Sequence, residues 1–224
     1  MSKKEENEFS FDTITEFDKH ISQSIPNYNI LFNSIVRLSD YFKDDKKVIY
    51  DVGCSTGNLL RHLAGFKLFD GKMVGLDVSR NLLPQNTRAW ENIDFIEHDL
   101  TKPYHFNNAC IVYCMFILQF LPKEYRLPLL KSIYAGLKPG GALFLCEKVY
   151  CREGNFQDMF TSTYYDYKKE SFTEKEIFDK ERSLRTMLKP NTQVENNLII
   201  CEAGFSKVET FWSYFQFRGQ LCIK

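Results

Sequence analysis

No hydrophobic run in the sequence approaches the ~20 residues that a membrane-spanning helix needs. The N-terminal segment MSKKEENEFSFD also lacks the apolar stretch that is typical of a secretory signal peptide. These two absences predict a cytoplasmic protein with no membrane partner.

An excess of charge of either sign is missing as well. The chain has 29 Lys and Arg residues against 29 Asp and Glu residues, so its formal net charge is zero. A protein that docks on nucleic acid usually presents a basic face to the phosphates. The balance therefore favours a small-molecule substrate, and no direct contact with nucleic acid is required.

The cysteine pattern does not indicate a disulfide framework. There are seven, an odd number, and no C-x-x-C pair occurs, which is typical of free thiols in a reducing compartment. Cys110 and Cys114 have the spacing of half a metal site. However, no second Cys/His pair lies at ligand spacing and both fall in the apolar run ACIVYCMFIL, so we interpret them as buried small side chains and expect no metal.

The length of 224 residues and the apolar fraction of 44% fit one domain with one core. No Pro- or Gly-rich linker and no repeat divides the chain. We expect a single domain over residues 1–224. Residues 1–45 should form an N-terminal helical extension, and residues 46–224 an α/β core with a helical insertion at about 152–190.

Short β-branched runs alternate with helical patterns through the first two thirds of the chain. Candidate helices cover 58–66 and 123–137, with KPGG closing the second, and two further helices are expected at about 11–22 and 27–43. The alternation indicates βαβ units with ligands at the carboxyl ends of parallel strands. FSKVETFWS and FQFRGQLCIK should add a terminal antiparallel pair. The expected parallel strands are 48–53, 73–79, 94–100, 109–116 and 142–149.

The turn after the first predicted strand reads Asp-Val-Gly-Cys-Ser-Thr-Gly-Asn over residues 51–58. Gly53 and Gly57 let the backbone approach a ligand, and the next helix offers free N–H groups. Alternatively, the glycines only satisfy a tight turn. Two other interpretations are weaker. A G-x-S-x-G nucleophile elbow led by Ser55 needs a late histidine, but the last one is His105. A dinucleotide site prefers G-x-G-x-x-G, which the turn does not match.

Acidic residues follow the next two predicted strands. Asp77 ends the second strand, where a carboxylate meets ribose hydroxyls in nucleoside sites, and Asp99 is placed at the end of the third. Each alone fits a helix cap or a solvated loop equally well. Together with the glycine turn they outline a pocket for adenosine. This layout resembles that of class I S-adenosylmethionine (AdoMet) methyltransferases from about Val48 to the end of the chain, and it implies their Rossmann-like fold with a mostly parallel seven-stranded sheet.

A narrower resemblance covers nearly the whole chain. In order, the sequence is similar to the carboxy-S-adenosyl-L-methionine synthase family at FD (11–12), SIPNY (24–28), DVGCS (51–55), LQFL (118–121), GLKPGGALFLCEK (136–148), YYDYKKESFTEKEI (164–177), ERS (181–183), EAGF (202–205) and a late FW…FQF.

That resemblance implies an enzyme. Its expected reaction converts AdoMet and prephenate to carboxy-S-adenosyl-L-methionine (carboxy-AdoMet) and phenylpyruvate, and the product serves as carboxymethyl donor for a tRNA wobble uridine modification. The resemblance also implies a homodimer, for which the aromatic segment 156–167 is a candidate surface.

The resemblance assigns roles to nine residues. The methionine part of AdoMet would be bound by Tyr28, Gly53, Cys54 and Ser55. Its ribose and adenine would be bound by Asp77, Val78, Asp99 and Leu100, and the added carboxylate by Arg182. Arginine suits a carboxylate because its planar fork pairs with both oxygens. Arg182 lies on a helix expected from Thr173, where TEKE forms a capping box. Read alone, this mixed-charge stretch fits a solvated helix face equally well.

The sequence departs from the family at two places. Met115 stands where the family has an asparagine, and Tyr164 and Tyr165 replace its two histidines. Two alternatives therefore stay open: an ordinary AdoMet methyltransferase acting on a small molecule or RNA, and a non-catalytic AdoMet-binding protein.

Overall fold

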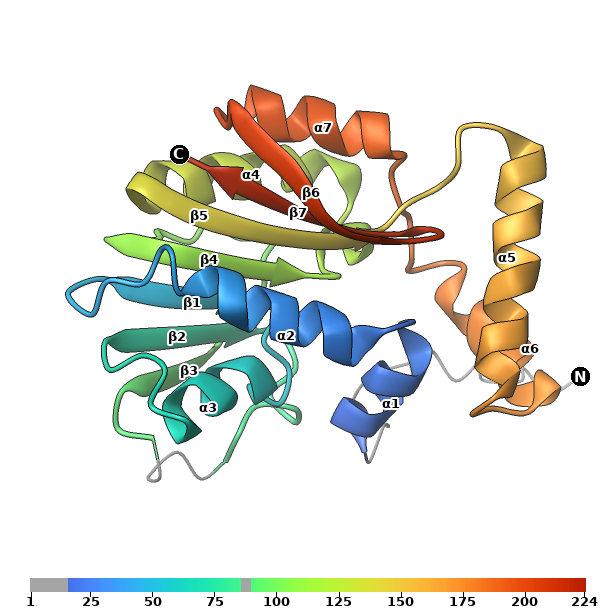
Figure 1. Cartoon of the computed structure of the whole chain (residues 1–224), viewed down its shortest axis with the longest axis horizontal. Coiled ribbons are helices and arrows are strands. Elements are labelled where there is room, and N and C mark those ends of the chain that lie inside the picture. Colours follow the sequence, from blue (N-terminus) through green and yellow to red (C-terminus); the bar gives the residue numbers. More distant parts are fainter. Residues whose placement is uncertain (1–15, 86–89) are drawn as a thin grey trace, which may run out of the picture.

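A computed structural model describes residues 16–85 and 90–224, and its centre is a seven-stranded sheet in the order β3-β2-β1-β4-β5-β7-β6 (Figure 1). Strands β1 to β5 pair in parallel, whereas β7 runs antiparallel to both β5 and β6. This confirms the predicted fold class and the terminal pair. The strands are β1 Val48–Val52, β2 Lys72–Asp77, β3 Ile93–Glu97, β4 Ala109–Met115, β5 Leu137–Lys148, β6 Lys207–Tyr214 and β7 Phe217–Ile223.

Helices cover both faces of the sheet. The helices are α1 Phe17–Ser24, α2 Tyr28–Ser39, α3 Asn58–Gly65, α4 Lys123–Gly136, α5 Gly154–Lys169, α6 Glu174–Leu184 and α7 Gln193–Glu202. Apolar side chains of α2 and α3 form one core cluster against the sheet, and those of α4 and α7 form a second. Strands covered on both faces read as continuous apolar runs, which explains the sequence ACIVYCM of β4.

The two cysteines of that run lie on opposite faces of β4. Cys110 packs with the α2–α3 side and Cys114 with the α4–α7 side, and both are fully buried. They therefore do not converge on one point.

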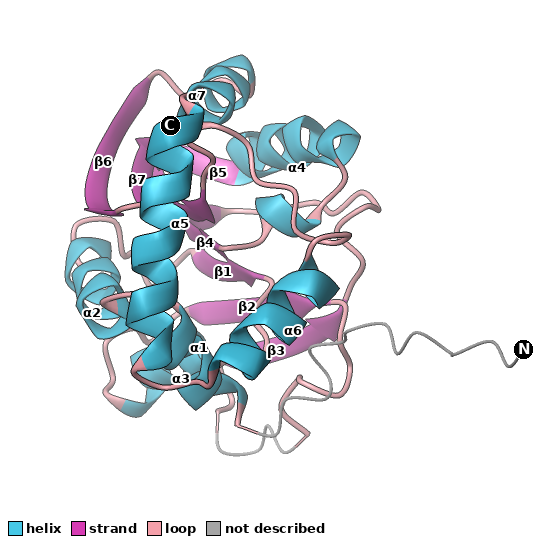
Figure 2. Cartoon of the chain, turned by 90° about the vertical axis from the view of Figure 1, so that its right-hand side faces the viewer, coloured by secondary structure: helices cyan, strands magenta, loops and turns pink. Residues whose placement is uncertain are grey.

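Helices α5 and α6 lie across the carboxyl edge of the sheet, in front of the strand ends (Figure 2). Thr173 caps α6 as predicted: its hydroxyl accepts a hydrogen bond from the Glu176 N–H, and the Glu176 carboxylate accepts one from the Thr173 N–H. The cap fixes where α6 begins. Between β5 and α7 the chain thus supplies a helical cover to the edge where a ligand is expected.

Several predicted boundaries were wrong by a few residues. KPGG does not separate α4 from a strand at 142, because β5 already begins at Leu137 and carries KPGG within it, with a register shift against β4 that Gly140 at φ +74° accommodates. Strand β3 ends at Glu97, since Asp99 turns the chain by accepting the Thr101 N–H. Helix α2 ends at Ser39. Residues 11–15 of the first predicted helix lie outside the described residues.

In the described part of the chain, every helix is too short or too polar to cross a membrane.

Candidate functional site

The predicted glycine turn follows β1 and is docked onto β2. The N–H groups of Gly53 and Cys54 both donate to the Leu76 carbonyl, at 2.7 and 2.9 Å. Gly53, Ser55 and Gly57 have positive φ values of 74°, 50° and 69°, a conformation that glycine adopts at little cost and serine rarely adopts. The turn is therefore held in one strained shape.

Both glycines are also required by close packing. A Cβ atom on Gly53 would lie 2.0 Å from the Ile117 side chain, and one on Gly57 would lie 2.3 Å from the Phe95 ring. The absence of side chains brings β3 and the segment after β4 against the turn. The turn thus occupies the centre of the carboxyl edge, between β2 and β4.

Asp77, the last residue of β2, holds this turn through hydrogen bonds. Its carboxylate accepts the Ser55 N–H and the Ser79 N–H, each at 2.8 Å, and the residue is only 9% exposed. The prediction that Asp77 ends the second strand is confirmed. The structure brings Asp77 and Ser55 into direct contact.

The Ser55 hydroxyl is buried and has no hydrogen-bond partner within residues 16–85 and 90–224. Such a group costs free energy unless a ligand supplies the partner. Because no histidine contacts this oxygen in the described residues, nothing there activates it as a nucleophile.

Asp51 is a member of the site that we did not single out from the sequence, although it begins the motif DVGCS. It is 5% exposed, and burial together with the nearby Asp77 carboxylate raises its pKa to about 7. Tyr28 lies beside it at the start of α2, and burial followed by the Asp51 charge raises the pKa of the Tyr28 hydroxyl. Two buried carboxyl groups close together favour a cationic ligand. The sequence feature that could have identified Asp51 is an acidic residue within an otherwise apolar strand.

Three further predicted residues lie on the adjacent rim. Val78 is 66% exposed directly after Asp77. The Asp99 carboxylate accepts the N–H and hydroxyl of Thr101, which lowers its pKa, and Leu100 packs against the sheet core. They follow β2 and β3, so the predicted nucleoside residues occupy neighbouring strand ends.

Glu147 of β5 was also not predicted. Its carboxylate accepts the N–H groups of Ile117, Leu118 and Gln119 at 2.9–3.1 Å, and the residue is 3% exposed. The Gln119 side-chain oxygen in turn accepts the Lys148 N–H at 2.8 Å. The segment after β4, which covers Gly53, is thereby tied to the end of β5.

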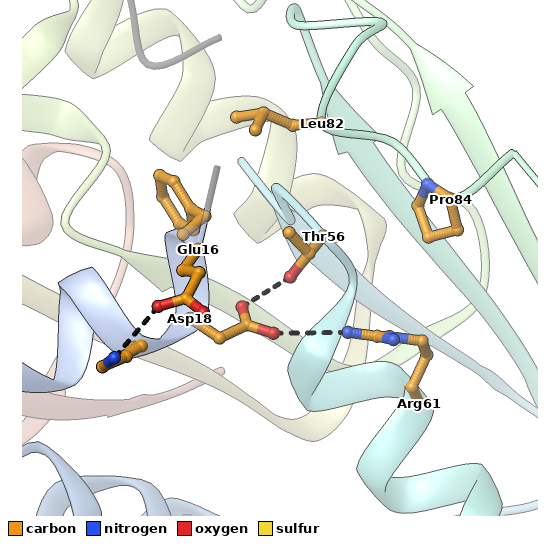
Figure 3. A pocket seen from close by; sticks show the side chains of 8 residues that line it. Glu16, Asp18, Thr56, Arg61, Leu82 and Pro84 are labelled. Atoms are coloured by element: carbon orange, nitrogen blue, oxygen red, sulfur yellow. Dashed lines mark hydrogen bonds and ion pairs between the residues drawn. The ribbon is translucent and has the colours of Figure 1, made fainter. Parts of the chain in front are cut away.

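Helix α1 closes against the glycine turn. Asp18 accepts a hydrogen bond from the Thr56 hydroxyl at 2.6 Å and forms an ion pair with Arg61 at 3.4 Å (Figure 3). A cavity of about 460 Å³ lies beside these contacts. It shares no lining residue with the nine predicted site residues. Its lining consists of Glu16, Phe17, Asp18, Lys19, Thr56, Arg61, Leu82 and Pro84.

Arg182 is exposed on α6 and lies near Lys175 and Asp179. The structure does not bring it to the glycine turn. Its neighbour Glu181 faces the protein instead: it accepts a hydrogen bond from the Tyr165 hydroxyl and pairs with Arg185 at 3.0 Å.

Two of the three positions that depart from the family pattern lie on the α2–α3 side of the sheet. Met115 and Tyr164 pack against the same core cluster as Tyr28. The Tyr164 hydroxyl donates to the Ser24 carbonyl at 2.7 Å and so links α5 to the end of α1.

The strand order, the glycine turn and the acid at the end of β2 together define a Rossmann-like protein of the class I methyltransferase type. A methyltransferase-domain family matches residues 49–141. Among solved structures, human N-acetylserotonin methyltransferase in complex with SAM superimposes with a TM-score of 0.59 at 18% identity, over 88% of this chain and 52% of that one.

The curated relatives are more specific. The carboxy-S-adenosyl-L-methionine synthase of Staphylococcus epidermidis is 31% identical over 95% of this chain and 94% of its own length, and that of Shewanella pealeana is 32% identical over 93% and 88%. The chain belongs to the carboxy-S-adenosyl-L-methionine synthase family of enzymes.

Proposed function

We propose that the protein converts AdoMet and prephenate to carboxy-AdoMet and phenylpyruvate, and so supplies the carboxymethyl donor for a tRNA wobble uridine modification. The observation that carries the proposal is the match to carboxy-AdoMet synthases over nearly the full length of both chains. In this reaction the carboxyl group lost by prephenate replaces one hydrogen of the AdoMet methyl group. The displaced proton leaves with the ring hydroxyl of prephenate as water.

The site's chemistry supports AdoMet as a substrate. The buried Ser55 hydroxyl lacks a partner in the described chain, and Asp77 stands where ribose hydroxyls meet an acid. The buried Asp51 carboxyl, with Tyr28 beside it, suits the cationic methionine end. In this proposal Gly53 and Cys54 line the methionine part, Val78 holds the ribose side, and Asp99 with Leu100 holds the adenine. One AdoMet-binding domain would then extend over residues 1–224.

The test is direct. Purified protein is incubated with AdoMet, with and without prephenate, and the nucleosides are identified by mass spectrometry. We expect a product heavier than AdoMet by one carbon dioxide only when prephenate is present, together with an equal amount of phenylpyruvate. Demethylated AdoMet on addition of a small molecule or RNA, with no carboxylated product, would instead support the ordinary methyltransferase, which the methyltransferase-domain match also permits.

Arg182 enters the proposal as the partner of the added carboxylate. The family resemblance at ERS supports this, and the exposed position of Arg182 on α6 leaves its guanidinium available. Loss of one partner of a charge pair that the ligand buries costs about 2–5 kcal/mol. Arg182→Ala should therefore weaken carboxy-AdoMet binding about thirtyfold or more and AdoMet binding less than about threefold. Equal weakening of both ligands would contradict the role.

A homodimer is part of the same proposal. Phe156 and Met159 of α5 and Phe178 of α6 are each about half exposed, at 49%, 51% and 53%, and apolar patches of this kind are common at subunit interfaces. Light scattering on the purified protein tests the dimer, and a Phe156→Asp variant should shift it toward monomer. No direct contact with nucleic acid is required for the reaction.

A further inference from the structure

Three lysines from three different elements converge at the carboxyl end of β5. Lys148 is the last residue of β5, Lys168 lies on α5 and Lys180 on α6. The Nζ atoms of Lys148 and Lys168 lie 4.8 and 5.4 Å from the centre of one ring, that of Tyr164. Lys180 contacts the His20 ring of α1 through its Nζ atom. We call Lys148, Lys168 and Lys180 the lysine cluster.

Lys168 is buried, Lys148 and Lys180 are half-buried, and their charges repel one another. Lys168 is 7% exposed. Burial, and after it the charge of Lys168, lowers the pKa of both Lys148 and Lys180 to about 8. His20 is neutral at pH 7, since burial and the charge of Lys180 lower its pKa to about 4. At neutral pH the lysine cluster therefore holds positive charge away from water.

Among residues 16–85 and 90–224, a single acid acts on both Lys148 and Lys168. Glu181 is the acid that acts on Lys148 and Lys168, but it already pairs with Arg185 and accepts the Tyr165 hydroxyl. For Lys148 and Lys168, burial of two cations against one shared carboxylate is unfavourable for folding alone. Such an arrangement is expected where a ligand supplies the missing negative charge.

The lysine cluster also lies on the appropriate side of the sheet. The acids assigned to ribose and adenine follow β2 and β3, and the glycine turn follows β1. In the order β3-β2-β1-β4-β5, the end of β5 lies on the other side of the glycine turn from the ends of β2 and β3. Lys148 ends β5, two residues after Cys146, which acts on the pKa of Tyr28.

Aromatic side chains surround the ammonium groups. Lys148 also lies 5.9 Å from the centre of the Phe217 ring, and Lys168 lies 5.5 Å from that of Phe172. The Tyr164 ring between them is fixed by its hydrogen bond to Ser24. Cations with apolar walls suit a small molecule that carries carboxylates on a carbon ring.

We propose that Lys148, Lys168 and Lys180 bind the carboxylate groups of the anionic co-substrate while AdoMet occupies the glycine turn. The inference rests on the proposed function and adds to it the residues that select a dicarboxylate. These lysines are binding residues, and the proposal assigns them no proton transfer.

The central test compares Lys168→Gln with the matched control Lys169→Gln. Lys169 is the next residue on α5, but its side chain is 47% exposed and pairs with Glu174. Protein saturated with AdoMet is titrated with prephenate in a calorimeter. We expect Lys168→Gln to weaken prephenate binding about tenfold or more, and Lys169→Gln to change it less than about twofold. The affinity for AdoMet should stay within about twofold in both variants.

Thermal unfolding separates a binding role from a structural one. Because Lys168 is a buried and repelled cation, Lys168→Gln should unfold at the same or a higher temperature than the wild type. A lower unfolding temperature together with an equal loss of AdoMet and prephenate affinity would overturn the proposal. Lys180→Gln gives a second measurement, with Lys175→Gln as control, since Lys175 is 86% exposed on the same helix.

Two further arms complete the design. Titration with carboxy-AdoMet asks whether the lysine cluster holds the product's carboxylate instead; if Lys168→Gln weakens that ligand and leaves prephenate unchanged, the proposal is wrong. Turnover assays separate the two proposals. A wild type that binds prephenate through Lys168 but forms no carboxylated product contradicts the proposed function alone. Turnover with an unchanged KM for prephenate in the lysine variants contradicts the lysine cluster alone.

Discussion

The glycine turn and the lysine cluster lie at the same edge of the sheet but are built in different ways. The turn spans residues 53–57 and is held by backbone hydrogen bonds to β2. Its glycines have no side chains, so neighbouring side chains pack directly against its backbone. The lysine cluster takes one side chain each from β5, α5 and α6, with His20 of α1 beside them. The first is specified by local sequence, and the second only by the packing of the insertion.

This difference has an energetic counterpart. In the turn, the positive φ of Ser55 is a local strain on a well-anchored backbone, and the Ser55 hydroxyl has no hydrogen-bond partner in the part of the chain that the structure describes. In the lysine cluster, the unfavourable term is charge repulsion among long side chains. Both are typical of binding sites, where stability is given up for a ligand.

The largest expected effect is on the turn. Gly53→Ala should lower the free energy of unfolding by about 2–4 kcal/mol, since alanine is strained at this φ and its methyl group overlaps Ile117. Urea denaturation measures this. Gly65→Ala is the matched control, because no atom lies within 4 Å of its added methyl group, and it should be neutral or stabilise by about 0.5–1 kcal/mol. Equal effects would mean that the turn is not closely packed.

Asp77→Ala should weaken AdoMet binding about ten- to a hundredfold, because charge-assisted hydrogen bonds of a carboxylate contribute roughly 1.5–3 kcal/mol. Calorimetry on the folded variant measures this, with Asp94→Ala as control, an exposed acid of β3 that pairs with Lys72. Prephenate binding at saturating AdoMet should change little. Unchanged AdoMet affinity would remove Asp77 from the nucleoside site.

Two identical helix caps allow the core and the insertion to be compared directly. Thr173 caps α6 and Thr192 caps α7, each in a capping box with a glutamate three residues later. Loss of either hydroxyl costs about 1 kcal/mol. We expect Thr192→Ala to lower the global free energy of unfolding by that amount, and Thr173→Ala mainly to speed hydrogen exchange in α6. The same global loss in both variants would show that core and insertion unfold as one unit.

The smallest expected effect is a pH dependence with two opposite signs. Facing Lys148 are Lys168 and Tyr164 from α5 and Glu181 from α6, and Lys180 lies beyond Lys168. With a pKa of about 8, Lys148 loses its charge between about pH 7 and pH 9, so prephenate affinity should fall by about threefold.

Over the same range the free energy of unfolding should rise, because the unfolded chain keeps the proton that folded Lys148 releases. Lys148→Gln should flatten both curves. Affinity and stability that change in the same direction would contradict the assignment.

The sequence predicted the local parts of the molecule well. The five parallel strands, the antiparallel end and the Thr173 cap follow from periodicity and capping signals, and the structure confirms them. The glycine turn and Asp77 were found because strand ends in an α/β pattern meet at one edge. The start of β5 was wrong because a register shift places KPGG within the strand. The end of β3 was wrong because the Asp99 side chain accepts a backbone N–H and turns the chain.

The remaining site residues were not predicted from the sequence. Asp51 was hidden in a buried strand, and the lysines of the cluster are spread over residues 148–180 in a stretch rich in charge, where a solvated helix face is the ordinary interpretation. Only the packing of α5 and α6 across the strand ends distinguishes Lys168 from Lys169. Which of two adjacent lysines is buried is a tertiary property.

The three N–H groups that donate to Glu147 fix the position of the segment after β4 within the site. Ile117, the first of them, lies over Gly53, and Lys148 follows Glu147 directly in β5. The segment that covers the glycine turn is therefore tied by three hydrogen bonds to the strand that carries Lys148. On the proposed assignment, a nucleoside and a dicarboxylate react only when their reacting atoms meet across the separation between the glycine turn and the lysine cluster.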